Sequence, residues 1–482
     1  MSQPRSTGAD PSPRAAATSS SLLGFVHRRR RGAELFLLIL ALGVGVGAYA
    51  AVGLEMDGVV PTDIATYGGW LAGLIILAHV AVRWTAPYAD PVLLPLVAAL
   101  NGLGLAVIHR LDVTYEAAGR DNHDFARQQL IWMTLGVLLF VGTLVVLRDH
   151  RVLQRFTYTS GLAAIVLLLL PMIPGLGVQI NGARIWISLG PFSFQPGEVA
   201  KVLLVIAFAG YLVLHRDALA LAGRRFLFVD LPRGRDLGPI LLMWLISLGV
   251  LVFQRDLGSS LLFFGLFLVM LYVATERPGW LFVGAGLVIA GGLAAYQMFA
   301  HVASRVDIWL DPFGHYGQGT DDRGRQLVET MFGMAWGGLI GRGFGNGSPE
   351  RIPYAESDFI MGAIGEELGL TGVIAVLLCY GLIVERGLRA ALVCRDGFGK
   401  LVATGLATVF ALQVFVVVGG VTGLIPLTGL TTPFLSYGGS SLVANWVIIA
   451  LLLRISDQAR RPVPDLSEDG GDEEATQVVR LP

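Results

Sequence analysis

The sequence predicts an all-α integral membrane protein with about 12 transmembrane helices and a large extracellular loop. Composition is the first reason, because 54% of the 482 residues are hydrophobic and only 15% are charged, whereas soluble proteins carry about 25% charged residues. The second reason is that apolar runs close to the roughly 20 residues needed to cross a bilayer recur along the whole chain. Basic residues are also concentrated in alternate connections between these runs.

Twelve apolar segments are predicted to cross the membrane, although two of them, 238–253 and 257–274, also fit one long bent span. An even number of spans places both termini on one side, and the loops of that side hold most of the arginines. The positive-inside rule therefore predicts a multi-pass protein of the cytoplasmic membrane with both termini in the cytoplasm. The predicted spans are 34–54, 64–83, 91–108, 128–147, 155–173, 195–214, 238–253, 257–274, 278–300, 359–384, 401–425 and 435–453.

The two ends of the chain have the composition of disordered cytoplasmic tails. Residues 1–31 are rich in Ser, Ala, Pro and Arg and finish in four consecutive arginines, which predicts a basic anchor at the membrane. Residues 461–482 are acidic and contain glycine. A signal peptide is not expected, because the apolar run after the arginines is too long.

The composition excludes several classes of function. A net charge of −1 gives no basis for nucleic-acid binding. The two cysteines, Cys379 and Cys394, predict neither a disulfide framework nor a thiolate metal site. The eight histidines lack a metal-binding spacing such as His-Glu-x-x-His, and no Gly-x-Ser-x-Gly motif is present. Any chemistry is therefore expected in or on the membrane.

The connection 301–358 is too long to be a simple link between spans and is predicted to be a functional extracellular loop. Its apolar stretch from Leu327 to Ile340 is too short to span and is interrupted by glycines, which is typical of a re-entrant or interfacial helix.

Charged residues inside predicted spans cost about 2.5–3.5 kcal/mol each, so they usually face a cavity or a partner. Glu198 and Lys201 open the sixth span, three residues apart on one helical face. They form either a structural ion pair or part of a polar cavity. Asp256 stands at the start of the eighth span, where it is either an N-cap or a chemically active carboxylate. A cap would lower its pKa, so a role as general base requires desolvation.

Two further clusters lie near the end of the chain. Asp358 is followed by Glu366 and Glu367, predicted to lie on the same helix with Glu366 about 12 Å further along. These carboxylates suit either a cavity or a divalent cation. The Pro/Gly-broken, hydroxyl-rich stretch 426–441 forms either a tight turn or a grip on phosphate or sugar.

At these clusters the chain resembles the SEDS family (shape, elongation, division, sporulation) of bacterial membrane proteins, which includes RodA and FtsW. The resemblance covers roughly residues 120–460, and the motifs stand in the family's order. The matching stretches are Asn181-Gly182-Ala183-Arg184-Ile185-Trp186-Ile187, Gln195-Pro196-Gly197-Glu198-Val199-Ala200-Lys201, Gln254-Arg255-Asp256-Leu257-Gly258, Gly337-Gly338-Leu339-Ile340-Gly341-Arg342-Gly343, Asp358-Phe359-Ile360 with Glu366-Glu367-Leu368-Gly369, and Pro433-Phe434-Leu435-Ser436-Tyr437-Gly438-Gly439-Ser440-Ser441.

The resemblance implies a ten-helix transmembrane core over 91–460, preceded by two extra helices within 32–90. That N-terminal extension looks most like the elongation-type members of actinobacteria. The resemblance also implies a peptidoglycan glycosyltransferase that polymerises lipid II on the outer face of the membrane. Its implied partners are lipid II, the undecaprenyl-diphosphate-linked glycan, membrane lipids and a class B penicillin-binding protein that supplies transpeptidation.

The family's essential aspartate falls on Asp256 and its supporting lysine on Lys201, so we expect these two, with Glu198, to form the catalytic group. Asp256 would act as general base on the acceptor's 4-hydroxyl, with inversion at the donor's anomeric carbon. No metal ligands are assigned, although Mg²⁺ or Mn²⁺ near the diphosphate is a candidate cofactor. The expected substrate-binding residues are Arg184, Gln195, Arg255, Arg305, Asp358, Glu366, Ser436, Tyr437 and Ser440. A lipid II flippase and a non-catalytic scaffold of the cell-wall synthesis complex are the alternative functions.

Overall fold

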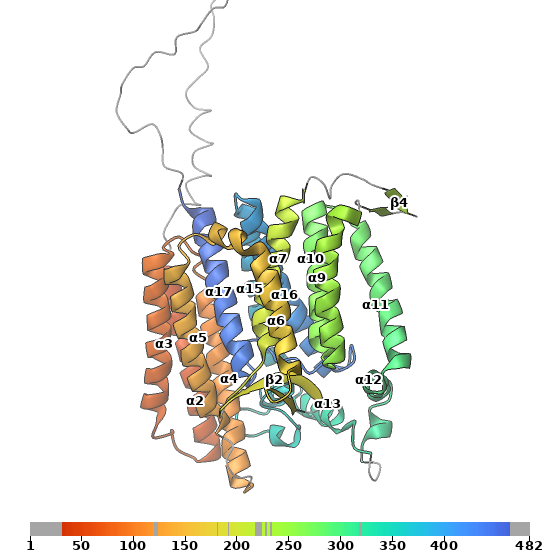
Figure 1. Cartoon of the computed structure of the whole chain (residues 1–482). Coiled ribbons are helices and arrows are strands. Elements are labelled where there is room, and N and C mark those ends of the chain that lie inside the picture. Colours follow the sequence, from red (N-terminus) through yellow and green to blue (C-terminus); the bar gives the residue numbers. More distant parts are fainter. Residues whose placement is uncertain are drawn as a thin grey trace, which may run out of the picture.

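The computed structural model describes residues 31–119, 124–180, 182–190, 192–216, 224–226, 229–231, 234–317 and 321–462. Apart from their innermost residues, the two predicted tails lie outside the described residues. The described chain is a bundle of long helices with small β-sheets at its two ends (Figure 1). This confirms the predicted all-α membrane fold.

Eleven segments of the described chain are long and apolar enough to cross a membrane, and the apolar part of α9 from Gly238 to Phe253 is shorter. The prediction of two separate helices at 238–253 and 257–274, in place of one bent span, is confirmed. The long helices are α2 (Arg31–Met56), α3 (Ile64–Thr85), α4 (Leu93–Ala117), α5 (Phe125–Val146), α6 (Thr157–Leu169), α7 (Pro196–Leu214), α9 (Gly234–Phe253), α10 (Leu257–Thr275), α11 (Gly279–Met298), α15 (Gly369–Val393), α16 (Gly397–Val421) and α17 (Gly439–Arg460).

Burial differs sharply between these helices. The apolar window of α17 is 89% buried, and those of α4, α7 and α16 are also mostly buried, whereas that of α11 is only 11% buried. Helices that are apolar on all sides can occupy either the centre of a bundle or its lipid-facing edge. Accordingly α17 lies in the middle of the bundle, and α11 stands beyond α9 and α10 at one side (Figure 1).

Both ends of the described bundle lie on one face, here called the terminal face. Near the start of α2, Glu34 is 2.6 Å from Nδ1 of His79, which is near the end of α3. Just after α3, the Tyr88 amide donates to Asp457 near the end of α17 at 2.8 Å. An even number of spans predicts this arrangement, with both ends of the chain on one side of the membrane.

The opposite face, here called the loop face, carries structure that the sequence did not predict. A three-stranded antiparallel sheet is formed by β1 (Gly177–Ile180), β2 (Ala183–Leu189) and β3 (Phe192–Phe194), in that order. These strands have three to seven residues, too short to stand out from a connection by apolar alternation. The short helices α12 (Ala300–Leu310) and α13 (Arg325–Gly337) lie on the same face (Figure 1), and α13 coincides with the predicted interfacial helix. A two-stranded sheet, β4 (Arg224–Phe226) with β5 (Val229–Leu231), belongs to another connection.

The predicted single span 359–384 is wrong, because the helix breaks at Gly369. The short α14 (Ile360–Glu367) ends there and α15 begins, with Gly369 at φ +67°, which a residue with a side chain rarely adopts. The break lets the Leu370 amide reach the Gly338 carbonyl at 3.0 Å. Asp358 precedes α14, so the prediction that Asp358 shares a helix with Glu366 is also wrong.

The stretch 426–438 is held against α4 by a close backbone approach. A Cβ on Gly104 would lie 2.7 Å from the Leu435 Cα, well inside normal contact distance. This approach fixes the segment that leads into α17.

We therefore expect Gly104→Ala to destabilise the fold by about 1–3 kcal/mol, because the added methyl group overpacks a buried contact. Gly142→Ala on α5 is the matched control, since a Cβ there meets nothing within 4 Å, and an added helical alanine stabilises by up to about 1 kcal/mol. Thermal unfolding of both variants in detergent checks the difference. Equal midpoints would contradict the close packing at Gly104.

Candidate active site

A cavity of about 380 Å³ lies on the loop face of the bundle, where several segments converge. Its walls come from the start of α5, the three-stranded sheet, the start of α7, the α9–α10 turn, α12 and the stretches 354–358 and 428–439. Seven of the predicted site residues line it. They are Gln195, Glu198, Arg255, Asp256, Arg305, Asp358 and Tyr437.

A turn with a left-handed residue holds Asp256 directly before the first residue of α10. Arg255 has φ +62°, a left-handed conformation that costs a non-glycine residue roughly 1 kcal/mol or more. Asp256 Oδ1 then accepts the Ser259 amide at 2.9 Å, which confirms the predicted N-cap. The turn brings both Arg255 and Asp256 to the wall of the cavity.

Burial outweighs the cap in setting the acidity of Asp256. Desolvation raises the pKa of this carboxyl above its ordinary value, while the hydrogen bonds from Ser259 and the charge of Arg305 lower it by less. The cap and the proposed chemistry are therefore compatible, because the low pKa expected of an N-cap does not result.

Glu198 and Lys201 form a buried ion pair with 2.5 Å between Nζ and Oε2. Lys201 is only 3% exposed and also donates to Gln413 Oε1 on α16 at 3.0 Å. Gln413 in turn donates to the Thr431 carbonyl at 2.8 Å. Glu198 reaches the cavity and Lys201 stands behind it, so this chain of contacts links α7, α16 and one wall of the cavity.

Lys201 is expected from the sequence to orient Asp256. Helices α7 and α10 do pack together, as that role requires. Among the described ion pairs, however, Lys201 is joined to Glu198 and not to Asp256. Glu198 acts electrostatically on Asp256, so an effect of Lys201 on Asp256 would pass through Glu198. The role itself stays a prediction.

Arg305 on α12 lines the cavity together with the carboxylates of Asp256 and Asp358. Both Asp256 and Asp358 act on its charge, and its Nη1 donates to the Leu427 carbonyl at 2.7 Å. Burial raises the pKa of Asp358 to about 7, and Arg305 opposes that shift. A second cavity of about 410 Å³ also has Arg305, Asp358 and residues 428–430 in its wall. These residues line both cavities.

The hydroxyls of the stretch before α17 are engaged within the protein. Ser436 Oγ donates to the Ser357 carbonyl at 2.6 Å, and Ser440 Oγ accepts the Gln195 amide at 2.9 Å. Tyr437 has its hydroxyl on Gln128 at 2.5 Å and still lines the cavity. The described contacts show Ser436 and Ser440 holding the wall, and their predicted substrate contacts stay untested.

Glu366 lies away from the cavity lining. Its Oε1 accepts the Ser348 amide at 2.6 Å. The neighbouring Glu367 pairs with Arg110 at 2.5 Å, and Arg110 also contacts Glu350 at 3.0 Å. These residues tie α4 and α14 to the long loop, and the predicted substrate contact of Glu366 stays untested.

Arg184 is exposed on β2 between two residues that line the cavity, and its amide donates to the Gln254 carbonyl at 3.3 Å. Asn181 of the same motif lies outside the described residues. The lining also contains side chains that we did not predict, among them Gln128, Trp132, Tyr354 and Glu356. Their common signal, a polar or aromatic residue near the end of a span, is too frequent in membrane proteins to single them out.

Comparison with known proteins decides the family. The sequence model of the FtsW, RodA and SpoVE cell cycle proteins matches residues 91–461. The chain belongs to the FtsW/RodA/SpoVE family. It is 49% identical over 435 residues to the peptidoglycan glycosyltransferase RodA of Mycobacterium tuberculosis, covering 90% of this chain and 92% of that protein. It is 33% identical over 375 residues to the probable peptidoglycan glycosyltransferase FtsW of Trichlorobacter lovleyi, covering 76% and 93%.

Solved structures of the FtsW/RodA/SpoVE family share the fold. A chain of a peptidoglycan synthase complex that coordinates polymerisation and crosslinking is 31% identical, with a TM-score of 0.61, covering 77% of this chain and 98% of that one. The rod shape determining protein RodA of Thermus thermophilus is 27% identical with a TM-score of 0.53, covering 78% and 98%. The resemblance inferred from the motifs is confirmed.

The buried pair behind the cavity gives a prediction for stability. Lys201→Met should destabilise the protein by about 3–5 kcal/mol, because it leaves the buried Glu198 carboxylate unpaired. The double variant Glu198→Gln/Lys201→Met should regain most of that loss. Thermal unfolding of the single and double variants checks this. A double variant as unstable as Lys201→Met would contradict the pairing, and recovered stability with lost activity would favour a positioning role.

Proposed function

We propose that this chain is a peptidoglycan glycosyltransferase that polymerises lipid II, with Asp256 as the general base. The carrying observation is the cavity of about 380 Å³ that holds a buried aspartate of raised pKa beside Arg305. A base near neutral pH needs such a raised pKa. The names of the related RodA and FtsW proteins support the same reaction.

In the proposed reaction the acceptor's 4-hydroxyl oxygen attacks the anomeric carbon of the donor sugar. The hydroxyl proton passes to Asp256, and the bond between that carbon and the diphosphate breaks with its electron pair on the diphosphate. Inversion at the anomeric carbon follows from this single displacement. One carboxylate is enough, since the diphosphate leaves without being protonated.

Negative charge develops on the departing diphosphate, so positioned cations would stabilise the transition state. Arg305 and Arg255 line the cavity together with Asp256 and are the candidates for this task. Arg184 lies at the rim on β2 and would act only if its exposed side chain folds toward the substrate. The two cavities that share Arg305 are the proposed sites for the donor and acceptor sugars.

We also propose that Mg²⁺ or Mn²⁺ assists the reaction. The positions of the carboxylates limit how such an ion could be held. Within the described residues, the carboxylates of the cavity do not bring three ligand atoms together, so a cage made only of protein oxygens is absent there. Mg²⁺ is usually held by one or two carboxylates and substrate phosphates. Asp358, which lies in the wall of both cavities, fits that role.

Orientation and partnership complete the proposal. Arginines gather in the loops of the terminal face, which supports a cytoplasmic position for that face and an outer position for the cavity. A class B penicillin-binding protein is the proposed partner, supported by the likeness to a synthase complex that joins polymerisation with crosslinking. The identity of 49% to mycobacterial RodA, against 33% to FtsW, supports a role in cell elongation and shape.

Asp256→Asn should lower the rate of lipid II polymerisation by at least about 10²–10⁴-fold, because a general base contributes that much. The exposed Asp57 lies in the α2–α3 connection, and Asp57→Asn serves as the matched control with unchanged activity. Labelled lipid II is incubated with each purified protein and its penicillin-binding partner, and the glycan product is measured.

Normal polymer from Asp256→Asn overturns the base assignment. Lipid II crossing liposome membranes without polymer formation would indicate a flippase, and growth supported by Asp256→Asn would indicate a scaffold.

The charge of Arg305 gives a prediction for pH dependence. Carboxylates of raised pKa become protonated as the pH falls, so activity should be lost on the acid side, at higher pH than for an exposed aspartate. Arg305 lowers the pKa of both Asp256 and Asp358. Arg305→Gln should therefore move the acid limb of the rate profile to higher pH, in addition to any decrease in the maximal rate.

Rates of polymerisation measured across the neutral range check this shift. Arg325→Gln on α13 is the control, because Arg325 is half-exposed and pairs at 3.7 Å with Asp322, outside both cavities. An acid limb that stays in place in Arg305→Gln would contradict the arrangement.

A further inference from the structure

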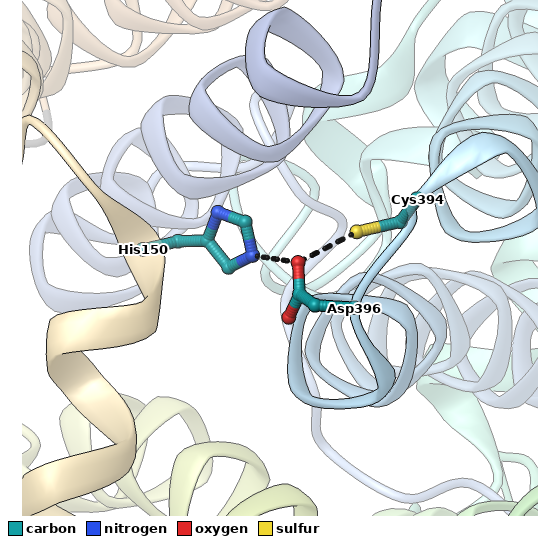
Figure 2. Close-up of side chains that lie close together, drawn as sticks. All are labelled: His150, Cys394 and Asp396. Atoms are coloured by element: carbon teal, nitrogen blue, oxygen red, sulfur yellow. Dashed lines mark hydrogen bonds and ion pairs between the residues drawn. The ribbon is translucent and has the colours of Figure 1, made fainter. Parts of the chain in front are cut away.

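A compact group of three chemically different side chains lies on the terminal face, on the opposite side of the bundle from the cavity. His150 opens the short helix η1 (His150–Phe156) after α5, and Cys394 and Asp396 lie in the connection between α15 and α16. Figure 2 shows the imidazole and the thiol converging on the same carboxylate oxygen. His150 Nε2 is 2.9 Å from Asp396 Oδ2, and Cys394 Sγ is 3.3 Å from it.

These donors match the coordination chemistry of zinc. Histidine nitrogen, cysteine sulfur and carboxylate oxygen are the ligands of Zn²⁺ in proteins. One ligand atom from each residue lies within 4.8 Å of the others, and in the part of the chain that the structure describes this is the one such group. Because 246 residues separate His150 from Asp396, no spacing in the sequence reveals it.

The backbone around the group is shaped to let the ligands approach. A side chain on Gly399, in the first turn of α16, would collide with both His150 Nε2 and Cys394 Sγ. The Gly399 amide also donates to Asp396 Oδ1 at 2.7 Å, which holds the carboxylate and leaves Oδ2 toward the imidazole and the thiol. Asp396 is therefore fixed by the helix end, and its second oxygen is directed into the group.

A second observation concerns the far side of the imidazole. His150 is 1% exposed, and its buried Nδ1 has no hydrogen-bond partner among the described residues. Asp149 Oδ1 lies 4.0 Å from that nitrogen, slightly too far for a hydrogen bond. Histidines that bind a metal through one nitrogen usually donate the other N–H to a carboxylate. Asp149 is placed for that role.

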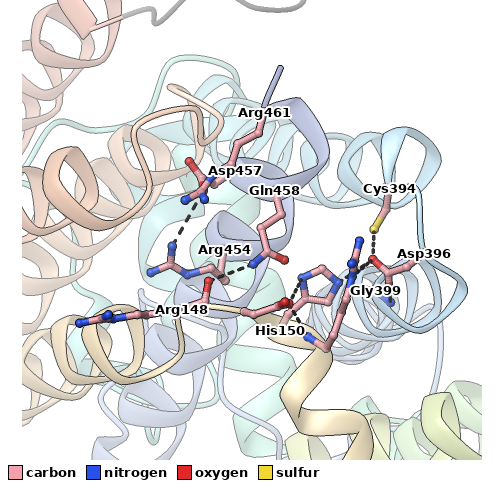
Figure 3. A network of polar contacts seen from close by, with 11 residues as sticks. Arg148, His150, Cys394, Asp396, Gly399, Arg454, Asp457, Gln458 and Arg461 are labelled. Atoms are coloured by element: carbon pink, nitrogen blue, oxygen red, sulfur yellow. Dashed lines mark hydrogen bonds and ion pairs between the residues drawn. The ribbon is translucent and has the colours of Figure 1, made fainter. Parts of the chain in front are cut away.

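A neighbouring positive charge is the main argument against a cation at this site. Arg151 Nε is 3.5 Å from Asp396 Oδ2, so an arginine now shares this carboxylate. Its side chain is 58% exposed and can turn into solvent, whereas the three ligands are held by the fold. The adjoining network at the end of α17 is joined to the same region (Figure 3), where Gln458 donates to the Arg148 carbonyl at 2.9 Å.

We propose that His150, Cys394 and Asp396 bind a zinc ion on the terminal face, with water in the fourth coordination position. On binding, the Cys394 thiol forms a bond to the metal through its sulfur and releases its proton to solvent. The ion joins the connection after α5 to the start of α16. Nothing in this site depends on the proposed glycosyl transfer.

The test uses the purified full chain in detergent, treated with a chelator, and Co²⁺ as the spectroscopic probe. One Co²⁺ per chain should bind and give a sulfur-to-cobalt charge-transfer band that Zn²⁺ then removes. Cys394→Ser should lose the band and Cys379→Ser should keep it, since Cys379 lies inside α15 and belongs to no such group. Asp149→Asn should weaken Zn²⁺ binding by about 10–100-fold.

Absence of the band in the unaltered protein, or an equal band in Cys394→Ser, overturns the site. Alkylation followed by mass spectrometry covers the case in which Cys394→Ser fails to fold, because it uses the unaltered chain. Zn²⁺ should protect Cys394 from alkylation and leave Cys379 as reactive as before. Equal rates at Cys394 with and without Zn²⁺ would show that the group is held by hydrogen bonds alone.

Discussion

Each buried lysine or arginine of the described bundle lies beside a carboxylate, because apolar surroundings make an unpaired ion cost several kcal/mol. Lys201 obeys that constraint with Glu198 and Gln413, and Arg110 obeys it with Glu367 and Glu350. Each pair also joins elements that are distant in sequence. The first links two central helices to the cavity wall, and the second attaches the long loop to α4 and α14.

In the lining of the cavity, carboxylates outnumber arginines. Four carboxylates line it, Glu198, Asp256, Glu356 and Asp358, against the two arginines Arg255 and Arg305. Neighbouring carboxylates help to keep the pKa of each aspartate raised, Glu198 acting on Asp256 and Glu356 on Asp358, with desolvation as the larger cause. A bundle that pairs its buried cations thus retains carboxylates of raised pKa at this cavity, with the pKa of Asp358 raised to about 7.

Much of the fold is readable from the sequence, because apolar length and arginine placement are strong signals. The twelve apolar helices and the helix inside the long loop follow from them. The break at Gly369 does not, since its cause is a contact between Gly369 and the distant residues 338–341 that no local pattern shows. The three-stranded sheet escapes detection because its strands are short. The cavity brings together four of the expected residues, Glu198, Asp256, Arg305 and Asp358. Glu366 lies outside the cavity lining, because its position depends on the same helix break.

The shared wall between the two cavities has a thermodynamic consequence. Arg305 and Asp358 belong to both cavities, so one guanidinium faces whatever occupies either of them. An anion bound on one side draws on the positive charge that would otherwise favour an anion on the other. Linkage makes such an effect reciprocal, so the affinities of the two cavities cannot be set independently of each other. The charge of Arg305 thus couples anion binding in one cavity to anion binding in the other.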